Sequence, residues 1–387
     1  MNSSQQIVLA QRPRGHVSVE DFRVQDVALP ELEAGDVALE TLFISIDPAI
    51  RGWLDDRPSY LPPVKIGEPV RAVGLARVTA SRNSNFTAGD IVRGFVGWQR
   101  RQIVSSPGTD WDRIASHEDV PLEHYLGILG MTGLTAWAGV CDILRPKPKH
   151  TVLISGASGA VGSVAVQLAK RAGARVVGIA GGAEKCSMVA RLGADAVVDR
   201  KAPDWKDQFE AATPDGIDRI FENSGGPMFE ASIARLNNHA HIALCGLIDG
   251  YNLTERPSGP INFGLLLTKR ILTQGFVVLD YMDSMIGLFR TGGFSLDLTH
   301  HAMHAMGSRM FGFTQEIFND NTDVDPAAEA EMWSAMAGTY PYIFEIFTAI
   351  SHDDASTVGP GCDDQFEFEF ALDLMLNGLE KLKRRSR

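Results

Sequence analysis

The sequence contains little cysteine, and none of it forms a paired motif. Its 387 residues include four cysteines, which lie far apart and form no CxxC pair. This pattern is typical of free thiols in a reducing compartment. The N-terminus has no long apolar run after a basic start, so no signal peptide is expected. Nowhere do about 18 apolar residues run together, so no transmembrane helix is expected. We therefore predict a cytoplasmic protein without a membrane partner.

Basic residues are too few to balance the acidic ones. The sequence has 36 Lys and Arg against 48 Asp and Glu, which gives a formal net charge of −12. A globally acidic protein gains little from the phosphate field of a nucleic acid, so no DNA or RNA partner is predicted. Hydrophobic residues make up 44% and charged residues 22%, as is ordinary for a globular protein. The length indicates two or three domains.

Ligands for a catalytic metal are also scarce. No cysteine precedes Cys141, and a GHE triplet and a lobe of four closely spaced cysteines are both absent. A catalytic zinc typically needs Cys and His ligands, so we expect no metal. His300 and His304 share a helix face at i, i+4 spacing, but no third ligand is evident. We interpret them as surface or pocket histidines.

Patterns of strands, turns and helices divide the chain into three parts. Residues 1–120 alternate short apolar runs with turn signals, which predicts a compact β domain. Residues 121–280 alternate strands with helices, which predicts a doubly wound parallel sheet. Residues 281–387 carry apolar residues at helical spacing only, which predicts an all-α bundle. The fold class is therefore α/β multidomain, and we expect the bundle to form a homodimer by burying apolar faces against a second copy.

A glycine-rich loop lies near the start of the second part. Residues 152–162 read as a strand, a glycine turn with GxxGxxG spacing and the start of a helix. Glycines let the backbone approach a pyrophosphate, and a helix N-terminus offers unpaired N–H groups and a positive dipole. The next strand begins about 20 residues later, which favours a dinucleotide-binding loop over a tight turn that binds no ligand. The cofactor contacts predicted here are Gly156, Ser158, Gly159, Ala160, Val161 and Gly162.

The end of the second strand predicts which dinucleotide binds. An NAD enzyme usually has Asp or Glu there, bonded to the ribose 2′-hydroxyl. Here the strand ends in small residues, among them Gly181, and Lys185 follows, while Arg200 comes after the third strand. These cations attract a 2′-phosphate, whereas a carboxylate repels it, so we predict NADP(H) as the cofactor. The alternative for Lys185 and Arg200 is that both are ordinary solvated residues.

Residues 1 to about 280 resemble the zinc-free medium-chain dehydrogenases/reductases of the prostaglandin reductase type. The stretches that carry the resemblance include SIDPAIR at 45–51, SYLPPVKIG at 59–67, YLGILGMTGLTAW at 125–137, FENSGG at 221–226 and CGLIDGYN at 245–252. The resemblance implies a GroES-like β domain followed by a Rossmann domain. It also implies that NADPH reduces the C=C bond of an α,β-unsaturated ketone or aldehyde, with an enolate forming on the carbonyl oxygen.

The same resemblance implies roles for individual residues. Tyr251 and Tyr60 would line the substrate site, with the Tyr251 hydroxyl near the developing enolate. Either tyrosine could equally be a packed loop aromatic. The remaining cofactor contacts that the resemblance implies are Met131, Thr132, Asn223, Cys245 and Gly246, the first two near the nicotinamide.

After about residue 280 the chain departs from that family. The family's return to the first domain, with a closing strand and a G-x-N-x-G-K motif, is absent. Residues 285–304 and 361–379 instead resemble the C-terminal effector-binding and dimerisation domain of tetracycline-repressor regulators. The helix-turn-helix that precedes this domain in those regulators is missing, which again predicts no sequence-specific DNA binding. Two functions stay open: an enone or enal reductase, which we favour, and an NADP(H)- and ligand-binding sensor or inactive fusion with little turnover.

Overall fold

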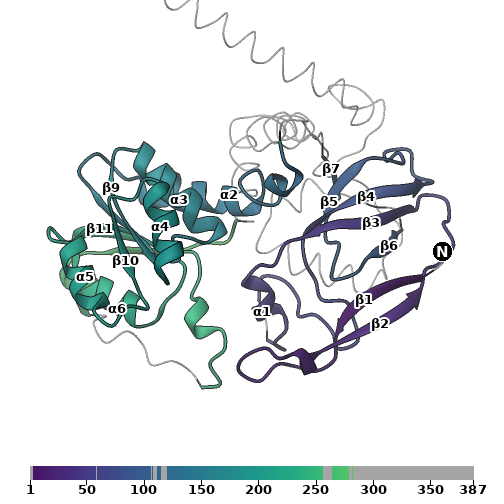
Figure 1. The fold of residues 1–387 in the computed structure, drawn as a ribbon, viewed down its shortest axis with the longest axis horizontal. Coiled ribbons are helices and arrows are strands. Elements are labelled where there is room, and N and C mark those ends of the chain that lie inside the picture. The colour runs from purple at the N-terminus through teal and green to yellow at the C-terminus, as the bar shows by residue number, and fades with distance from the viewer. Residues whose placement is uncertain are drawn as a thin grey trace, which may run out of the picture. The chain divides into compact units, whose positions relative to one another are not determined.

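The computed structural model places the described residues in two units (Figure 1). The described residues are 3–57, 59–105, 107, 111–114, 120–255, 264–278 and 281. Of these, the first unit holds residues 3–11, 22–126 and Tyr281, and the second holds residues 12–21 and 127–278. The predicted helical bundle, apart from Tyr281, lies outside the described residues, and so do His300 and His304.

The first unit is built from antiparallel strands. A two-stranded sheet pairs β1 (Ser3–Leu9) with β2 (Phe22–Ala28). A five-stranded sheet has the order β6-β3-β4-β5-β7. Its strands are β3 (Val37–Ile44), β4 (Gly74–Ser81), β5 (Ile91–Gly94), β6 (Arg101–Val104) and β7 (Asp112–Arg113). This agrees with the β domain predicted from the turn signals.

Two apolar clusters hold the first unit together. Along β3, Val37 and Leu39 point to the same face and are buried with Val78 and Val92 of the neighbouring strands. A second cluster forms around the short helix α1 (Ala49–Trp53), which buries Trp53 against residues of β1 and of the following loop. Each buried side chain of this size contributes about 1.5–3 kcal/mol through the hydrophobic effect.

The second unit contains one parallel sheet of six strands, in the order β10-β9-β8-β11-β12-β13. The strands are β8 (Thr151–Ile154), β9 (Arg175–Ala180), β10 (Ala196–Asp199), β11 (Ile217–Glu222), β12 (Leu236–Leu244) and β13 (Leu272–Gly275). All four residues of β8 are buried, as expected for a strand with helices on both faces. The predicted doubly wound sheet is confirmed. Its strand order reverses between β8 and β11.

Helices cover both faces of this sheet. On one side lie α2 (Met131–Trp137), α3 (Ala160–Arg171) and α4 (Ala183–Arg191), and on the other α5 (Trp205–Ala212) and α6 (Gly226–Ala234) (Figure 1). Right-handed crossovers require this arrangement, because the chain changes direction across the sheet after β10. A π-helical turn, η3 (Ala138–Leu144), continues α2, and the short α7 (Gly264–Thr268) precedes β13.

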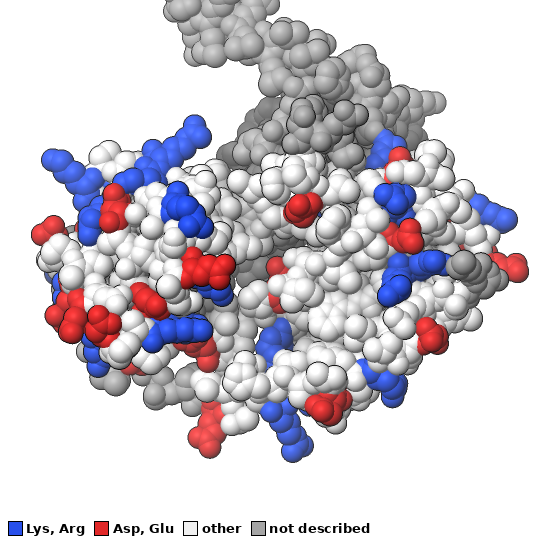
Figure 2. Space-filling model, in the orientation of Figure 1, with Lys and Arg blue, Asp and Glu red and all other residues white. Residues whose placement is uncertain are grey.

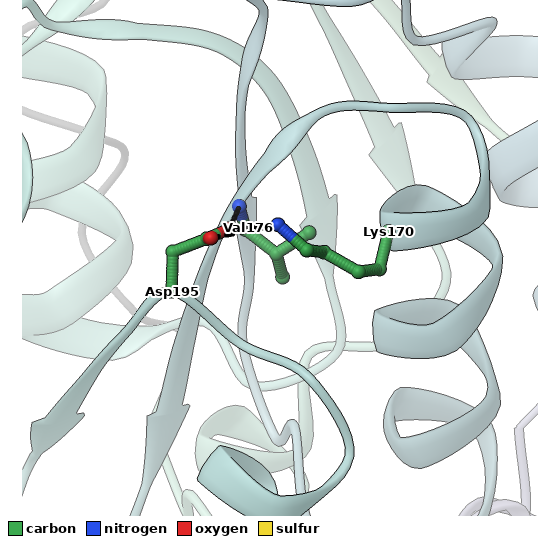
Figure 3. Close-up of polar contacts among 3 residues, drawn as sticks. All are labelled: Lys170, Val176 and Asp195. Atoms are coloured by element: carbon green, nitrogen blue, oxygen red, sulfur yellow. Dashed lines mark hydrogen bonds and ion pairs between the residues drawn. The ribbon is translucent and has the colours of Figure 1, made fainter.

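One carboxylate connects helix α3 to the sheet (Figure 3). Asp195, just before β10, accepts hydrogen bonds from Lys170 Nζ at 2.6 and 2.8 Å and from Val176 N at 2.7 Å. Burial opposes ionisation of Asp195, but these hydrogen bonds and the charges of Lys170 and Arg175 outweigh it and lower its pKa. These bonds fix the C-terminal end of α3 to the start of β9. The N-terminal end of α3 directly follows the glycine loop.

The described surface carries charges of both signs. On the face drawn in Figure 2, acidic and basic side chains alternate over the described residues rather than forming one continuous basic area. In the part of the chain that the structure describes, no helix is both long and apolar enough to cross a membrane. The absence of a nucleic-acid partner, the cytoplasmic location and the homodimer stay predictions.

Candidate active site

Most of the predicted cofactor residues follow the C-terminal ends of parallel strands. Gly156 comes after β8, Gly181 after β9, Arg200 after β10, Asn223 after β11, and Cys245 and Gly246 after β12. Because the C-terminal ends of parallel strands meet at one edge of a sheet, the fold brings these residues to the same edge. The reversal of strand order between β8 and β11 puts Gly156 and Asn223 on either side of the position where ligands bind in such sheets.

The glycine loop is tightly folded on itself. Gly156 has φ +57°, a conformation that glycine adopts without strain. Ala157 N donates to Ile179 O at 3.0 Å, and Gly159 N donates to Gly156 O at 2.9 Å. A Cβ at Gly162 would overlap the carbonyl oxygen of Gly156 and lie 2.9 Å from Ala157 Cα. Glycine at 162 therefore lets the first turn of α3 start directly against the loop.

The N-terminus of α3 offers donors for an anion. The helix begins at Ala160 after Gly159, with no capping hydrogen bond from a side chain and no acidic residue in its first turn. The first N–H groups of a helix have no acceptor within it, so those of Ala160, Val161 and Gly162 point out of the helix end. Together with the helix dipole they form a site for a phosphate group. Ser158 lies in the same loop and is half-buried.

Two cations converge at the end of β9. A Cβ at Gly181 would lie 3.4 Å from Arg200 Nε and 3.4 Å from Lys201 Cε. The sequence analysis predicts Arg200 as a cofactor contact and does not include Lys201. The position of Lys201 next to Arg200, just after the third strand, could have indicated it. The carboxylate of Asp199 is turned to the backbone, where it accepts from Gly182 N at 2.8 Å and Lys201 N at 2.9 Å. Those hydrogen bonds lower the pKa of Asp199. Lys185 lies exposed in the first turn of α4.

A buried carboxylate joins β8 to β11 beneath the glycine loop. Glu222 Oε1 accepts from Ser155 Oγ, Ser224 N and Gly225 N, each at 2.7 Å. Asn223 completes the network, since its N donates to Ser155 Oγ and its Nδ2 donates to Ser155 O, both at 2.7 Å. Burial raises the pKa of Glu222, and Asp249 adds to that, while the three hydrogen bonds act against it. Sequence reasoning missed Glu222, because it selected only the neighbouring Asn223 from that stretch.

The segment after β12 folds back onto this network. Cys245 N and Gly246 N both donate to Glu222 O, at 2.9 and 3.1 Å. A Cβ at Gly246 would lie 3.1 Å from Asn223 O and 3.6 Å from Tyr251 Oη. The Tyr251 hydroxyl therefore lies at the strand end that also carries Asn223. Burial, with the charge of Glu222, raises the pKa of Cys245 to about 12, so this thiol stays neutral.

The other predicted residues lie elsewhere. Tyr60 belongs to the first unit, whereas Tyr251 belongs to the second. Tyr60 is 44% exposed, and its ring meets that of Trp53 edge-on with centroids 6.2 Å apart. Met131 and Thr132 begin α2, which packs against α3, and Thr132 Oγ1 donates to Gly127 O at 2.8 Å. These two residues therefore lie on the helix next to the one that starts at the glycine loop.

Metal ligands are expected to be scarce in this chain. Within the described ranges, no three His, Cys, Asp or Glu side chains come together as metal ligands. The expectation of a zinc-independent site stays a prediction, and no step below involves a metal.

Three family descriptions match the chain. One described as the N-terminal domain of oxidoreductase matches residues 5–113, and one described as zinc-binding dehydrogenase matches residues 160–290. The C-terminal domain described as tetracyclin repressor-like matches residues 264–383, which confirms the resemblance inferred for the last part of the chain.

Individual relatives agree with the first two matches. An NADPH-dependent curcumin reductase of Escherichia coli is 43% identical over 278 residues, which cover 70% of this chain and 79% of that protein. A 2-alkenal reductase (NADP(+)-dependent) of Nicotiana tabacum is 37% identical over 72% of this chain and 82% of its own length. The crystal structure of CurA in complex with NADPH from Vibrio vulnificus is 38% identical and superposes with a TM-score of 0.68 over 78% of this chain and 88% of that one. The chain belongs to the medium-chain dehydrogenase/reductase family, in the group that contains the curcumin, alkenal and prostaglandin reductases.

Proposed function

We propose that this chain is an NADPH-dependent reductase of the C=C bond in α,β-unsaturated ketones or aldehydes. The observation that carries the proposal is the gathering, at one edge of the parallel sheet, of an anion-binding loop, a pair of cations and a tyrosine hydroxyl. Relatives named as NADPH-dependent curcumin reductase, 2-alkenal reductase and (+)-pulegone reductase support the choice of reaction.

The residues present fit NADPH. Gly162 lets the first turn of α3 pack directly against the glycine loop, and the N–H groups at this start of α3 are the proposed donors to the pyrophosphate. Arg200 and Lys201 offer positive charge for the 2′-phosphate, and Lys185, exposed in the first turn of α4, is proposed as a third cation for it. Asn223, Met131 and Thr132 are proposed to border the nicotinamide. Cys245 and Gly246 are proposed as further contacts of the dinucleotide. NADPH, when bound, supplies a hydride to the β-carbon of the substrate.

Tyr251 is the proposed catalytic residue. Hydride addition moves the π electrons of the C=C bond toward the carbonyl, so negative charge develops on the carbonyl oxygen. A hydrogen bond donated by Tyr251 Oη to that oxygen stabilises the enolate more than the neutral ketone and so speeds the reaction. The α-carbon then takes a proton from water, which completes the saturated product. The family resemblance implies a substrate contact for Tyr60 as well, and that role stays a proposal.

The test is a titration of the purified chain with NADPH and NADH, followed by fluorescence, and then addition of 3-nonen-2-one while reduced nicotinamide is followed by absorbance. Tight NADPH binding with turnover is the expected result. Binding without turnover would favour the sensor alternative, for which the tetracyclin repressor-like match is the supporting observation. Absence of NADPH binding would contradict both.

A further inference from the structure

The loop between β1 and β2 belongs to a different unit from the strands that it connects. Residues 12–21 group by their contacts with the second unit, although β1 and β2 are part of the first. The loop is internally ordered: Asp21 is 4% exposed and accepts from Ser18 N at 2.8 Å, and Asp21 N donates back to Ser18 O at 3.2 Å. Pro13 is buried as well. This is therefore a fixed segment with a defined place on the second unit.

That place is the segment directly after Tyr251. Asn252 Nδ2 and His16 Nδ1 are 3.3 Å apart, and because the amide nitrogen is a donor, Nδ1 is the acceptor. Next to this contact, Gly15 has φ +78°, and a Cβ on it would lie 3.6 Å from Thr254 Cγ2 and 3.7 Å from Asn252 O. The two segments thus meet through backbone and side chains together, one residue away from Tyr251.

The turn that carries Tyr251 is anchored to the end of β11 before Tyr251 and held by local bonds after it. Ile248 N donates to Asn223 O at 3.4 Å and Asp249 N to Ser224 O at 2.8 Å, whereas Tyr251 N donates to Ile248 O at 3.1 Å and Leu253 N to Gly250 O at 3.2 Å. A segment held by short-range bonds opens easily unless a neighbouring element packs on it. The contact of His16 with Asn252 comes from a residue 236 positions away in the chain, so it adds a tie to the part of the turn that follows Tyr251, whereas the bonds to Asn223 and Ser224 hold the part before it.

Both segments also expose aliphatic side chains. Val17 is 40% exposed and Leu253 49% exposed, and each directly follows a member of the hydrogen-bonded pair His16 and Asn252. Each of the two segments that meet at this contact therefore carries an exposed apolar side chain next to it in the sequence. Exposed apolar groups that gather next to a polar reacting group are typical of a site for a ligand with an apolar part.

We propose that the loop Arg12–Asp21 is a wall of the substrate site, in which His16 is a positioning residue for Tyr251 and Val17 contacts the apolar chain of the substrate. The proposal rests on the proposed function, since it assigns this loop to the enone end of the same site. His16 acts through Asn252, which it holds in place together with the adjoining turn.

The experiment compares four variants with the wild-type chain: His16→Ala, His16→Gln, Val17→Ser and, as a control, Arg14→Ala, which removes an exposed side chain of the same loop. Each is assayed for kcat/KM with 3-nonen-2-one and with the short enone 3-buten-2-one, for NADPH affinity, and for hydrogen–deuterium exchange of residues 248–254. We expect His16→Ala to lower kcat/KM about 3- to 10-fold with both enones, the effect of losing one hydrogen bond, and to speed the exchange. His16→Gln, which keeps an acceptor, should recover part of both.

Val17→Ser should lower kcat/KM for 3-nonen-2-one several-fold through KM and leave 3-buten-2-one unchanged, while NADPH affinity stays constant in all four variants. Equal losses for long and short enones in Val17→Ser would overturn its contact with the apolar chain. Exchange of residues 248–254 that is the same in His16→Ala as in Arg14→Ala would overturn the positioning role. If the wild-type chain binds NADPH without reducing any enone, the proposed function fails, and the exchange measurement still decides whether His16 holds the Tyr251 turn.

Discussion

Removing the two cations at the end of β9 should abolish most of the preference for NADPH over NADH. Arg200 Nε and Lys201 Cε each lie 3.4 Å from the Cβ position of Gly181, so the two atoms are at most twice that distance apart. A 2′-phosphate is wide enough to meet both side chains at once, and the guanidinium can offer two parallel N–H donors to it. NADH has a hydroxyl in that position and gains little from either charge.

The size of the effect follows from the type of contact. A hydrogen bond to a charged group contributes about 1.5–3 kcal/mol, and about 1.4 kcal/mol corresponds to a tenfold change in Kd. Because the strand end is open to solvent, we take the lower limit, which gives about tenfold weaker NADPH binding for Arg200→Ala and for Lys201→Ala. The double variant should lose less than the product of the two, since both side chains share one phosphate. Lys185→Glu should weaken NADPH binding by about tenfold or more for the same reason.

The measurement is a fluorescence titration with NADPH and NADH at low and high ionic strength. Lys147→Ala is the control, because Lys147 is an exposed lysine before β8, at the opposite edge of the sheet. We expect the Kd for NADPH alone to rise, and the difference from wild type to shrink as salt screens the charges. Parallel losses for NADPH and NADH would refute the reasoning, because they would mean that the substitutions disturb the loop rather than remove a phosphate contact.

Three further variants test other parts of the site. Tyr251→Phe should lower kcat for enone reduction about 10²- to 10³-fold while NADPH affinity stays the same, as for loss of one donor to a developing oxyanion; equal rates would remove Tyr251 from the mechanism. Gly162→Ala should weaken NADPH and NADH binding alike, because its Cβ would overlap a loop carbonyl oxygen; unchanged titrations would contradict this. Burial and the charge of Arg219 lower the pKa of His150 and His241 below the usual value of 6.5. As the pH falls through 6.5, the unfolded chain therefore binds more protons than the folded chain. The free energy of unfolding in urea should therefore be greatest above about pH 6.5 and decline below it, and His241→Asn should flatten that decline.

The parallel sheet and its glycine loop could be predicted because local signals determine them. Near-continuous apolar runs separated by helical periodicity predict buried parallel strands, and all six strands are present. The spacing of Gly156, Gly159 and Gly162 reflects steric needs that the structure displays directly. Such features depend on residues close together in the sequence, which makes them readable without a structure.

The features that sequence reasoning missed depend on distant pairs. Glu222 is stabilised inside the sheet by Ser155 as well as by its neighbours Ser224 N and Gly225 N, and Ser155 is 67 positions away in the sequence. His16 carries no recognisable motif, and its contact with Asn252 exists only in the folded chain. In the sequence Lys201 has no feature that separates it from a solvated lysine, and only the fold places its side chain next to Gly181. The family resemblance predicts Tyr60 and Tyr251 together, and in the structure they belong to separate units.

The return of β11 to the side of β8 has a consequence for the order in which the protein assembles. The glycine loop and β8 leave the ribosome well before Glu222 and Asn223, so the loop is made long before the two residues that hydrogen-bond Ser155 next to it. Because contacts of such sequence separation carry a larger loop-closure cost, we expect them to form after the β8, β9 and β10 pairings. Affinity for the dinucleotide should therefore arise only when β11 has docked, which makes cofactor binding during refolding a reporter of the second half of the sheet rather than of the loop itself.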